Sequence, residues 1–403
     1  MQSKAIICIN GSTTYGPTIR AREGDTVKVK VINMLLRNED ITIHWHGISQ
    51  VGTPWMDGVA QITECGIDVG ESFEYSFLAD QAGTYWYHGH VEGQREDAFY
   101  GAIVVEPLGG YPFAFDEEMI VFVSDFYTAY PLDQLLGLTT VPWTWVGSPQ
   151  IQFINGDPKL TITVNAGKTY LLRLINSASI SYYNFGIGGH NMTIVEVEES
   201  FVKPQMVPNL YINAGERYSV LVRADNPGCF LITTDMLQRA GPSGSARFVY
   251  NGSGCDDSSG YVNGAANFVT FDPLSLHALN ATIIPSATRT VNANPRQVRD
   301  SELIISWTIN DISFKMPPMN LLIGAYYNHS HTLPSTNAIP LYPGEVIDLV
   351  LVNQYRWDNV TQEQHPWHLH GHSFWVLGTG VGTVVNDSLL NLVDPVKRDT
   401  FTL

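Results

Sequence analysis

The chain has 403 residues, 44% of them hydrophobic and 15% charged, and carries a formal net charge of −17 at pH 7. This length predicts two or three domains with ample volume for hydrophobic cores. The negative charge disfavours nucleic acid and anionic membranes as partners, and no apolar run approaches the roughly 18 residues that span a bilayer.

The first quarter of the chain has the pattern of short β-strands. Segment 25–33 alternates, with Val27, Val29 and Val31 on one side and polar residues on the other, as in a half-buried strand. Further strand patterns occupy residues 41–47, 72–77, 83–90 and 101–107. Short strands separated by turns indicate a β-sandwich or barrel.

This β pattern recurs twice along the chain. A glycine, a β run and a terminal asparagine occur from Gly24 to Asn33, again from Gly167 to Asn176, and a third time from 344 to 353. The spacing is far too long for a solenoid and predicts related β domains. We expect an all-β protein with four segments: a first domain over 1–107, a second over 108–272, a connection over 273–300 and a third domain over 301–403.

The cysteines and sequons bear on the compartment. Cys8, Cys65, Cys229 and Cys255 match no CxxC pattern. We expect a disulfide between Cys229 and Cys255 in an oxidising compartment, with two buried thiols as the alternative. Seven N-x-S/T triplets favour a glycosylated, secreted protein; they begin at Asn10, Asn191, Asn251, Asn280, Asn328, Asn359 and Asn386. Because the first residues lack the apolar region of a signal peptide, we expect that signal to be missing from this sequence.

Histidines are clustered beyond what random placement of 12 residues would give. Five His-x-His pairs occur, at 44/46, 88/90, 329/331, 368/370 and 370/372. The pair at 329/331 overlaps a sequon in a polar segment, so we expect it to be solvated, and we expect the same of the isolated His190 and His277.

The segment 364–372 contains four histidines. In an extended strand, His368, His370 and His372 would project from one face and His365 from the other. Imidazole-rich ligation suits copper, zinc, iron or nickel. A zinc hydrolase would use three protein ligands and usually a carboxylate base, whereas histidine pairs that meet between the first and third units fit a multinuclear copper centre better.

Three motifs resemble the copper-binding segments of the multicopper oxidases. They are His-Trp-His-Gly at 44–47, Trp-Tyr-His-Gly-His at 86–90 and His-Pro-Trp-His-Leu-His-Gly-His at 365–372. The Met-Asp-Gly segment at 56–58 strengthens the resemblance, which covers essentially the whole chain and is greatest to laccase-type, fungal-like members. It implies three cupredoxin-like Greek-key β-sandwich domains, the third of them incomplete here.

The resemblance also implies which residues bind copper. By position, the type 2 ligands would be His44 and His368. The type 3 pair would be held by His46, His88, His90 and His370. His365 would be one type 1 ligand, and His372 matches a position that is not a ligand. Asp57 matches a carboxylate that assists proton delivery, with a simple turn residue as the alternative.

The sequence departs from the family in its cysteines. The family's fourth motif, His-Cys-His, supplies two type 3 histidines, the type 1 cysteine and, shortly after it, a second type 1 histidine, and no such segment is present. Without a thiolate a blue type 1 site cannot form. We therefore expect a truncated sequence whose chain alone is inactive, with Cys65 resembling a residue that pairs with a C-terminal cysteine in relatives.

The implied activity is a laccase-type oxidation. Phenolic or similar small reductants would be oxidised while dioxygen is reduced by four electrons to water, in a monomeric protein. Two alternatives are a ferroxidase acting on Fe(II) and a non-catalytic, truncated copper-binding β protein. Gly188 stands where relatives often have an acidic residue, which argues against anchoring phenol or iron there. The nearby Glu196, Glu198 and Glu199 could take the place of that acidic residue, but such a cluster more often forms a solvated face.

Overall fold

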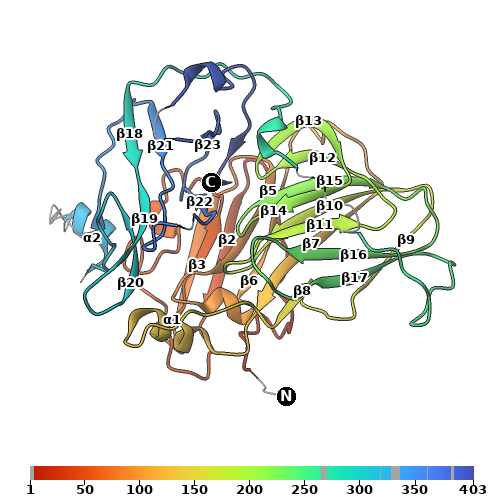
Figure 1. The fold of residues 1–403 in the computed structure, drawn as a ribbon, viewed down its shortest axis with the longest axis horizontal. Coiled ribbons are helices and arrows are strands. Elements are labelled where there is room, and N and C mark those ends of the chain that lie inside the picture. Colours follow the sequence, from red (N-terminus) through yellow and green to blue (C-terminus); the bar gives the residue numbers. More distant parts are fainter. Residues whose placement is uncertain are drawn as a thin grey trace.

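The computed structural model describes residues 4–264, 269, 271–317, 319–327, 336–360, 362–382 and 385–403. Strands dominate it, and its two α-helices are short, α1 (Pro131–Thr139) and α2 (Leu321–Tyr326). No helix in these ranges is long and apolar enough to cross a membrane. The expected all-β architecture is therefore confirmed, and three β units lie around a common centre near β3 and β22 (Figure 1).

The first unit combines a four-stranded sheet of order β1-β6-β5-β3 with the antiparallel pair β2-β4. Its strands are β1 (Ile19–Arg22), β2 (Thr26–Ile32), β3 (Ile43–His46), β4 (Ser72–Leu78), β5 (Gly83–Gly89) and β6 (Tyr100–Glu106). Along β2, half-buried Val27, Val29 and Val31 alternate with exposed residues, as the sequence predicts. They pack against a core that contains Trp45 and Tyr75.

The second unit is a sandwich of a six-stranded sheet, β13-β12-β15-β10-β7-β8, and a five-stranded sheet, β14-β11-β16-β17-β9. Its strands are β7 (Glu117–Phe126), β8 (Ile151–Ile154), β9 (Thr161–Val164), β10 (Thr169–Asn176), β11 (Tyr183–Ile187), β12 (Met192–Val197), β13 (Ser200–Val207), β14 (Asn209–Ile212), β15 (Arg217–Arg223), β16 (Cys229–Met236) and β17 (Gly244–Tyr250). The expected disulfide joins Cys229 to Cys255, with Cα atoms 5.8 Å apart.

The third unit consists of paired strands. They are β18 (Arg289–Ala293) with β21 (Ile347–Leu351), β19 (Pro295–Arg299) with β20 (Ile305–Ile309), β22 (Pro366–His368) with β25 (Thr400–Thr402), and β23 (Phe374–Trp375) with β24 (Lys397–Arg398). Strands β18 and β19 lie inside 273–300, the segment expected to be a plain connection. That expectation is corrected here, because both strands pair with strands of the third unit.

The repeated asparagine has a structural role in all three units. The side-chain amide of Asn33 donates to the carbonyls of Glu39 and Ile67, and that of Asn176 donates to the carbonyls at 181 and 212. Asn353 likewise donates to the carbonyl of Glu363. Each amide therefore ties the end of a strand to a later part of the same unit, which explains why the residue recurs at this position.

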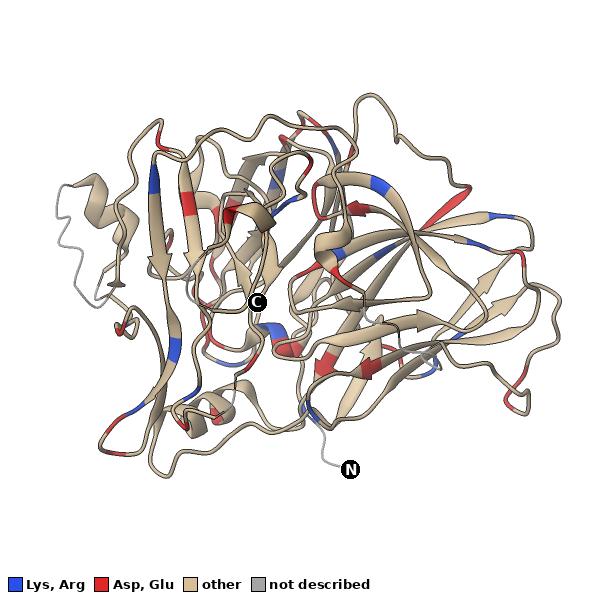
Figure 2. Ribbon diagram, turned by 45° about the horizontal axis from the view of Figure 1, so that its top comes forward, with Lys and Arg blue, Asp and Glu red and all other residues tan. Residues whose placement is uncertain are grey.

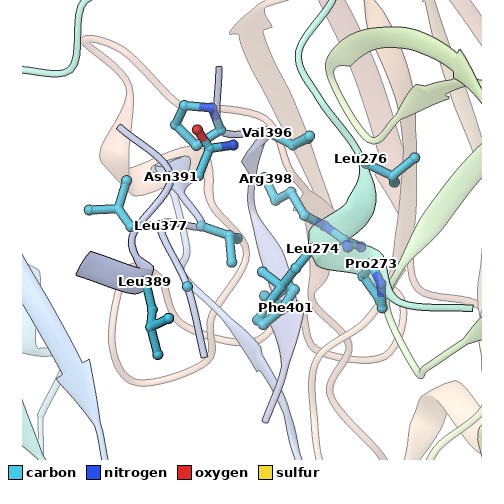
Figure 3. A pocket seen from close by; sticks show the side chains of 12 residues that line it. Pro273, Leu274, Leu276, Leu377, Leu389, Asn391, Val396, Arg398 and Phe401 are labelled. Atoms are coloured by element: carbon cyan, nitrogen blue, oxygen red, sulfur yellow. The ribbon is translucent and has the colours of Figure 1, made fainter. Parts of the chain in front are cut away.

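A small cavity of about 90 Å³ lies where the third unit packs on the second, and most of the side chains that line it are apolar. Arg398 and Phe401 reach it from the last strands and meet Pro273 and Leu274 of the short 3-10 helix η3 (Pro273–Ser275), as Figure 3 shows. Val396 continues into the core of the second unit. Lys and Arg segments are spread over the fold among the acidic ones (Figure 2).

Candidate metal centre

Six histidines from three strands converge between the first and third units. His44 and His46 lie on β3, which pairs with β5 so that His44 faces His88. His90 directly follows β5, while His368 ends β22 and His370 lies in the turn after it. The ring centroid of His44 lies 4.0–5.5 Å from those of the other five, namely His46, His88, His90, His368 and His370.

His44 and His368 face each other across the two units, with their Nε2 atoms 3.2 Å apart. Nδ1 of His44 lies 2.8 Å from the carbonyl oxygen of Asp57, and Nδ1 of His368 lies 2.9 Å from that of Asp399. A carbonyl can only accept, so each Nδ1 carries the proton and each Nε2 keeps a free lone pair. Metal-binding histidines are held in this way by their second ring nitrogen.

The other four imidazoles surround this pair. His46 stacks on His368 with centroids 3.6 Å apart, and His90 lies 5.2 Å from His370. His88 donates from Nδ1 to the carbonyl of Gly89 at 3.0 Å, so its Nε2 is also free. Several of these nitrogens lie close enough together to share a metal ion, for example those of His44, His46 and His88.

Burial keeps five of these imidazoles, those of His46, His88, His90, His368 and His370, uncharged. It lowers the pKa of His46 and His88 well below the ordinary value, and neighbouring histidine charges lower both further. Burial also lowers the pKa of His90, to about 3. Because a metal ion binds the unprotonated ring, these imidazoles are in the form that can bind a metal ion near neutral pH.

Two further histidines of the segment 364–372 lie elsewhere. His372 is exposed and does not join His368 and His370, contrary to the alternation expected for an extended strand. The reason is that β22 ends at His368 and Gly371 turns the chain with φ +66°. His365 does lie apart from the cluster, as predicted, and its ring contacts Trp307 at 4.5 Å. The 329/331 pair lies outside the described residues.

His365 is suited to a second metal site. Its Nε2 atom is buried without a hydrogen-bond partner among the described residues. Burial lowers its pKa; the carboxylate of Glu363 opposes this, and the charge of Arg239 adds to it. An orphaned ring nitrogen of an uncharged histidine is a candidate ligand.

Asp57 supports the cluster from the first unit. Its Oδ2 accepts from Nδ1 of His370 at 2.9 Å, and its Oδ1 lies 3.3 Å from Nδ1 of His44. Burial by itself raises its pKa, but the two histidines outweigh burial and hold the pKa below its ordinary value. Asp57 therefore contacts one imidazole of the first unit and one of the third. It also ends the 3-10 turn η1 (Pro54–Met56).

A second carboxylate, Asp399, was missed by the sequence reasoning. It is fully buried, lies 3.3 Å from both Nε2 of His46 and Nδ1 of His368, and forms a bidentate pair with Arg217. Glu198 accepts the backbone N–H groups of Asp399 and Thr400 at 2.7 and 3.1 Å. In the sequence, the only sign of a buried carboxylate here is the charged run Lys-Arg-Asp at 397–399, which lies inside a strand pattern.

Two expectations about polar residues are wrong. Glu196, Glu198 and Glu199 form no solvated face; they are at most 5% exposed because they lie where the three units meet. His190 is buried too, bound to the carbonyl of Gly188 at 2.6 Å and to the hydroxyl of Tyr250 at 2.7 Å. His277 is half-exposed and contacts Asp394.

Comparison with known proteins identifies the family. Three models described as "Multicopper oxidase" match residues 1–109, 117–253 and 307–403. The chain belongs to the multicopper oxidase family. This multicopper oxidase is 31% identical to L-ascorbate oxidase of Cucurbita maxima, over 99% of the chain and 80% of the relative. It is 30% identical to Laccase-22 of Oryza sativa subsp. japonica, over 99% of the chain and 81% of the relative.

Solved structures agree with this assignment. The solved structure of Fet3p, "a Multicopper Oxidase that Functions in Iron Import", matches with a TM-score of 0.87 and 26% identity, over 99% of this chain and 79% of that one. Laccase from Botrytis aclada matches with a TM-score of 0.80 and 25% identity, over 98% of this chain and 76% of that one. The expected three cupredoxin-like domains and an oxidoreductase activity are therefore confirmed.

The multicopper oxidase family implies type 1, type 2 and type 3 copper. The residues present fit such centres, because four imidazoles of the cluster, His44, His88, His368 and His370, donate from Nδ1 and leave Nε2 free. His365 adds one orphaned nitrogen on the far side. No cysteine of the sequence stands beside a histidine, so the thiolate of a type 1 site is not among these residues.

Proposed function

We propose that the six clustered histidines hold a three-copper centre and that His365 is a ligand of a separate type 1 copper. His44 and His368 are assigned to type 2 copper, because their free Nε2 atoms point at one position. The type 3 pair is assigned to the four remaining imidazoles of the cluster, namely His46, His88, His90 and His370. When bound, copper supplies one-electron chemistry at each centre.

We further propose that the native protein oxidises a small organic reductant and passes the electrons to dioxygen, forming water. The observation behind this is the link between the two sites: His365 and His368 are three residues apart on one segment. Asp57 and Asp399 would hold the imidazoles of His370 and His368 and keep negative charge beside the cluster. A buried carboxylate hydrogen-bonded to a ligand histidine is suited to move protons to reduced oxygen.

An organic reductant fits the surroundings of His365 better than Fe(II). The carboxylate of Glu363 and, more weakly, the guanidinium of Arg239 act on His365, and the cation of this pair repels a metal ion. The nearby carboxylate Glu363 is bound to Arg356 at 2.9 Å. Phenols are neutral, and ascorbate, which gives the ascorbate oxidases their name, is anionic. Neither is repelled by a positive charge near His365. The disulfide supports secretion.

The ferroxidase alternative rests on the likeness to Fet3p. Oxygen uptake by the copper-loaded native protein separates the two, with a phenol, ascorbate and Fe(II) as reductants under identical conditions. Our proposal expects a far higher kcat/KM for an organic reductant. Saturable Fe(II) oxidation of much greater efficiency would establish the ferroxidase, and no oxygen uptake with any reductant would support the non-catalytic copper-binding alternative.

A further inference from the structure

A second, larger pocket opens between the segment after α1 and the strands β19 and β20. Its volume is about 250 Å³, and we call it the Trp143–Trp357 pocket. Its lining is Val141, Pro142, Trp143, Arg299, Leu303, Ile305 and Trp357. In Figure 1 the chain around α1 passes below β20, consistent with this placement. Two indoles and aliphatic side chains make the pocket suited to a flat apolar group.

Strand register connects this pocket to His365. In the antiparallel pair β19-β20, Arg299 lies opposite Ile305 and Gln297 lies opposite Trp307. Residues two apart along a strand lie on the same face, about 7 Å from each other. Ile305 and its cross-strand neighbour Arg299 therefore lie at about this distance from Trp307. Trp307 in turn contacts the ring of His365 at 4.5 Å.

A second row of side chains begins at Trp143, which lines the pocket. The rings of Trp143 and Trp145 stack with centroids 6.2 Å apart, and the guanidinium of Arg239 lies 5.6 Å from the Trp145 ring. Trp143 and Trp145 therefore extend the aromatic surface of the pocket, whereas the β19-β20 row leads to the histidine that we assign to type 1 copper.

Arg299 gives the pocket its charge. Its guanidinium lies 4.7 Å over the ring of Trp357, and among the described residues no carboxylate lies within ion-pair distance of it. The adjacent Asp300 is used by its own turn, where Oδ1 accepts the backbone N–H groups of Glu302 and Ile304 at 2.9 Å. A guanidinium without a carboxylate partner beside two indoles recognises an aromatic anion.

We propose that the Trp143–Trp357 pocket binds the carboxylate end of an aromatic acid of the hydroxycinnamate type. The phenol end of the same molecule then lies at Trp307, against His365. This subsite rests on the proposed oxidation of organic reductants and names their class. An uncharged phenol would bind at Trp307 and would gain no affinity from Arg299.

Binding of cinnamate to the native protein tests the subsite without any turnover, because cinnamate has no phenol to oxidise. The change in tryptophan fluorescence gives Kd. Arg299→Gln should weaken cinnamate about tenfold or more, as expected for loss of a charge-assisted hydrogen bond. Arg296→Gln is the matched control, since Arg296 lies on the same strand and pairs with Asp311; its Kd should match the native value. Cinnamyl alcohol should bind Arg299→Gln and native protein alike.

The proposal is overturned if native protein does not bind cinnamate, if Arg299→Gln binds it unchanged, if Arg296→Gln weakens it equally, or if the alcohol loses as much affinity as the acid. Oxidation of 4-hydroxycinnamate supplies a second readout, in which Arg299→Gln should raise KM about tenfold at unchanged kcat. Tight cinnamate binding without oxidation of any phenol would retain the subsite and refute the proposed function.

Discussion

His44 and His368, 324 residues apart in sequence, place their Nε2 atoms 3.2 Å from each other, and each ring is fixed by a backbone carbonyl at its Nδ1. The two rings belong to different β units, so the cluster exists only when the first and third units are docked. Copper binding and the docking of these units should therefore stabilise each other.

Removing one of these imidazoles should release copper. We predict that His368→Ala lowers copper affinity by more than the roughly 10–100-fold typical of losing an outer hydrogen-bond partner. Metal analysis after dialysis measures this. His372→Ala is the control, since His372 lies in the same segment but is exposed. Equal copper loss in both variants would contradict the assignment.

The turn that carries Asp57 should be intolerant of a side chain at Gly58. Gly58 has φ +81°, and a Cβ there would lie 1.8 Å from the carbonyl oxygen of Ile43, next to His44. Gly58→Ala should cost about 1–2 kcal/mol from backbone strain and about 1–3 kcal/mol more from the overlap. Gly52→Ala, at φ +75° in open space, should show the strain alone. Urea denaturation measures both, and equal losses would refute the overlap.

The buried pair between Arg217 and Asp399 should be important for stability. Arg217→Gln leaves Asp399 charged and unpaired beside His46, and breaking such a pair costs about 3–5 kcal/mol. Arg296→Gln, which removes an exposed pair with Asp311, should cost at most about 1 kcal/mol. Denaturant midpoints of the two variants compare these losses, and similar values would show that Arg217 has no special role.

Glu64 should make stability depend on pH. Burial raises its pKa to about 7, opposed by the hydrogen bond from Tyr75 and aided by the charge of Asp57. The folded state binds this proton more tightly than the unfolded state does. Protonated Glu64 therefore adds to the free energy of unfolding below the ordinary glutamate pKa, and this contribution is lost as the pH rises to about 7. The loss is on the order of 3 kcal/mol.

Glu64→Gln should therefore flatten the pH dependence in that window while keeping an oxygen acceptor for Tyr75. Thermal unfolding of native protein and variant across pH 4–8 provides the comparison. A parallel decline of both proteins with rising pH would assign the effect to other groups.

Local patterns explain what could be predicted from the sequence. Strand β2 and the histidine pairs of β3 and β5 could be predicted, because side chains two residues apart lie on the same face of a strand and this spacing can be read from the sequence. Asp399 and Arg217 could not be found this way, because their pairing joins residues 182 apart. Glu198 and His190 were misread as solvated because their burial depends on packing between units or sheets. The position of His372 depends on the turn at Gly371.

The most direct test of the proposed copper centre is the location of copper in crystals of the copper-loaded native protein, from anomalous scattering at the copper absorption edge. We predict copper between His44 and His368, and two further ions among His46, His88, His90 and His370. Copper bound only at other residues, or a cluster of histidines that stays metal-free at full copper loading, would contradict it.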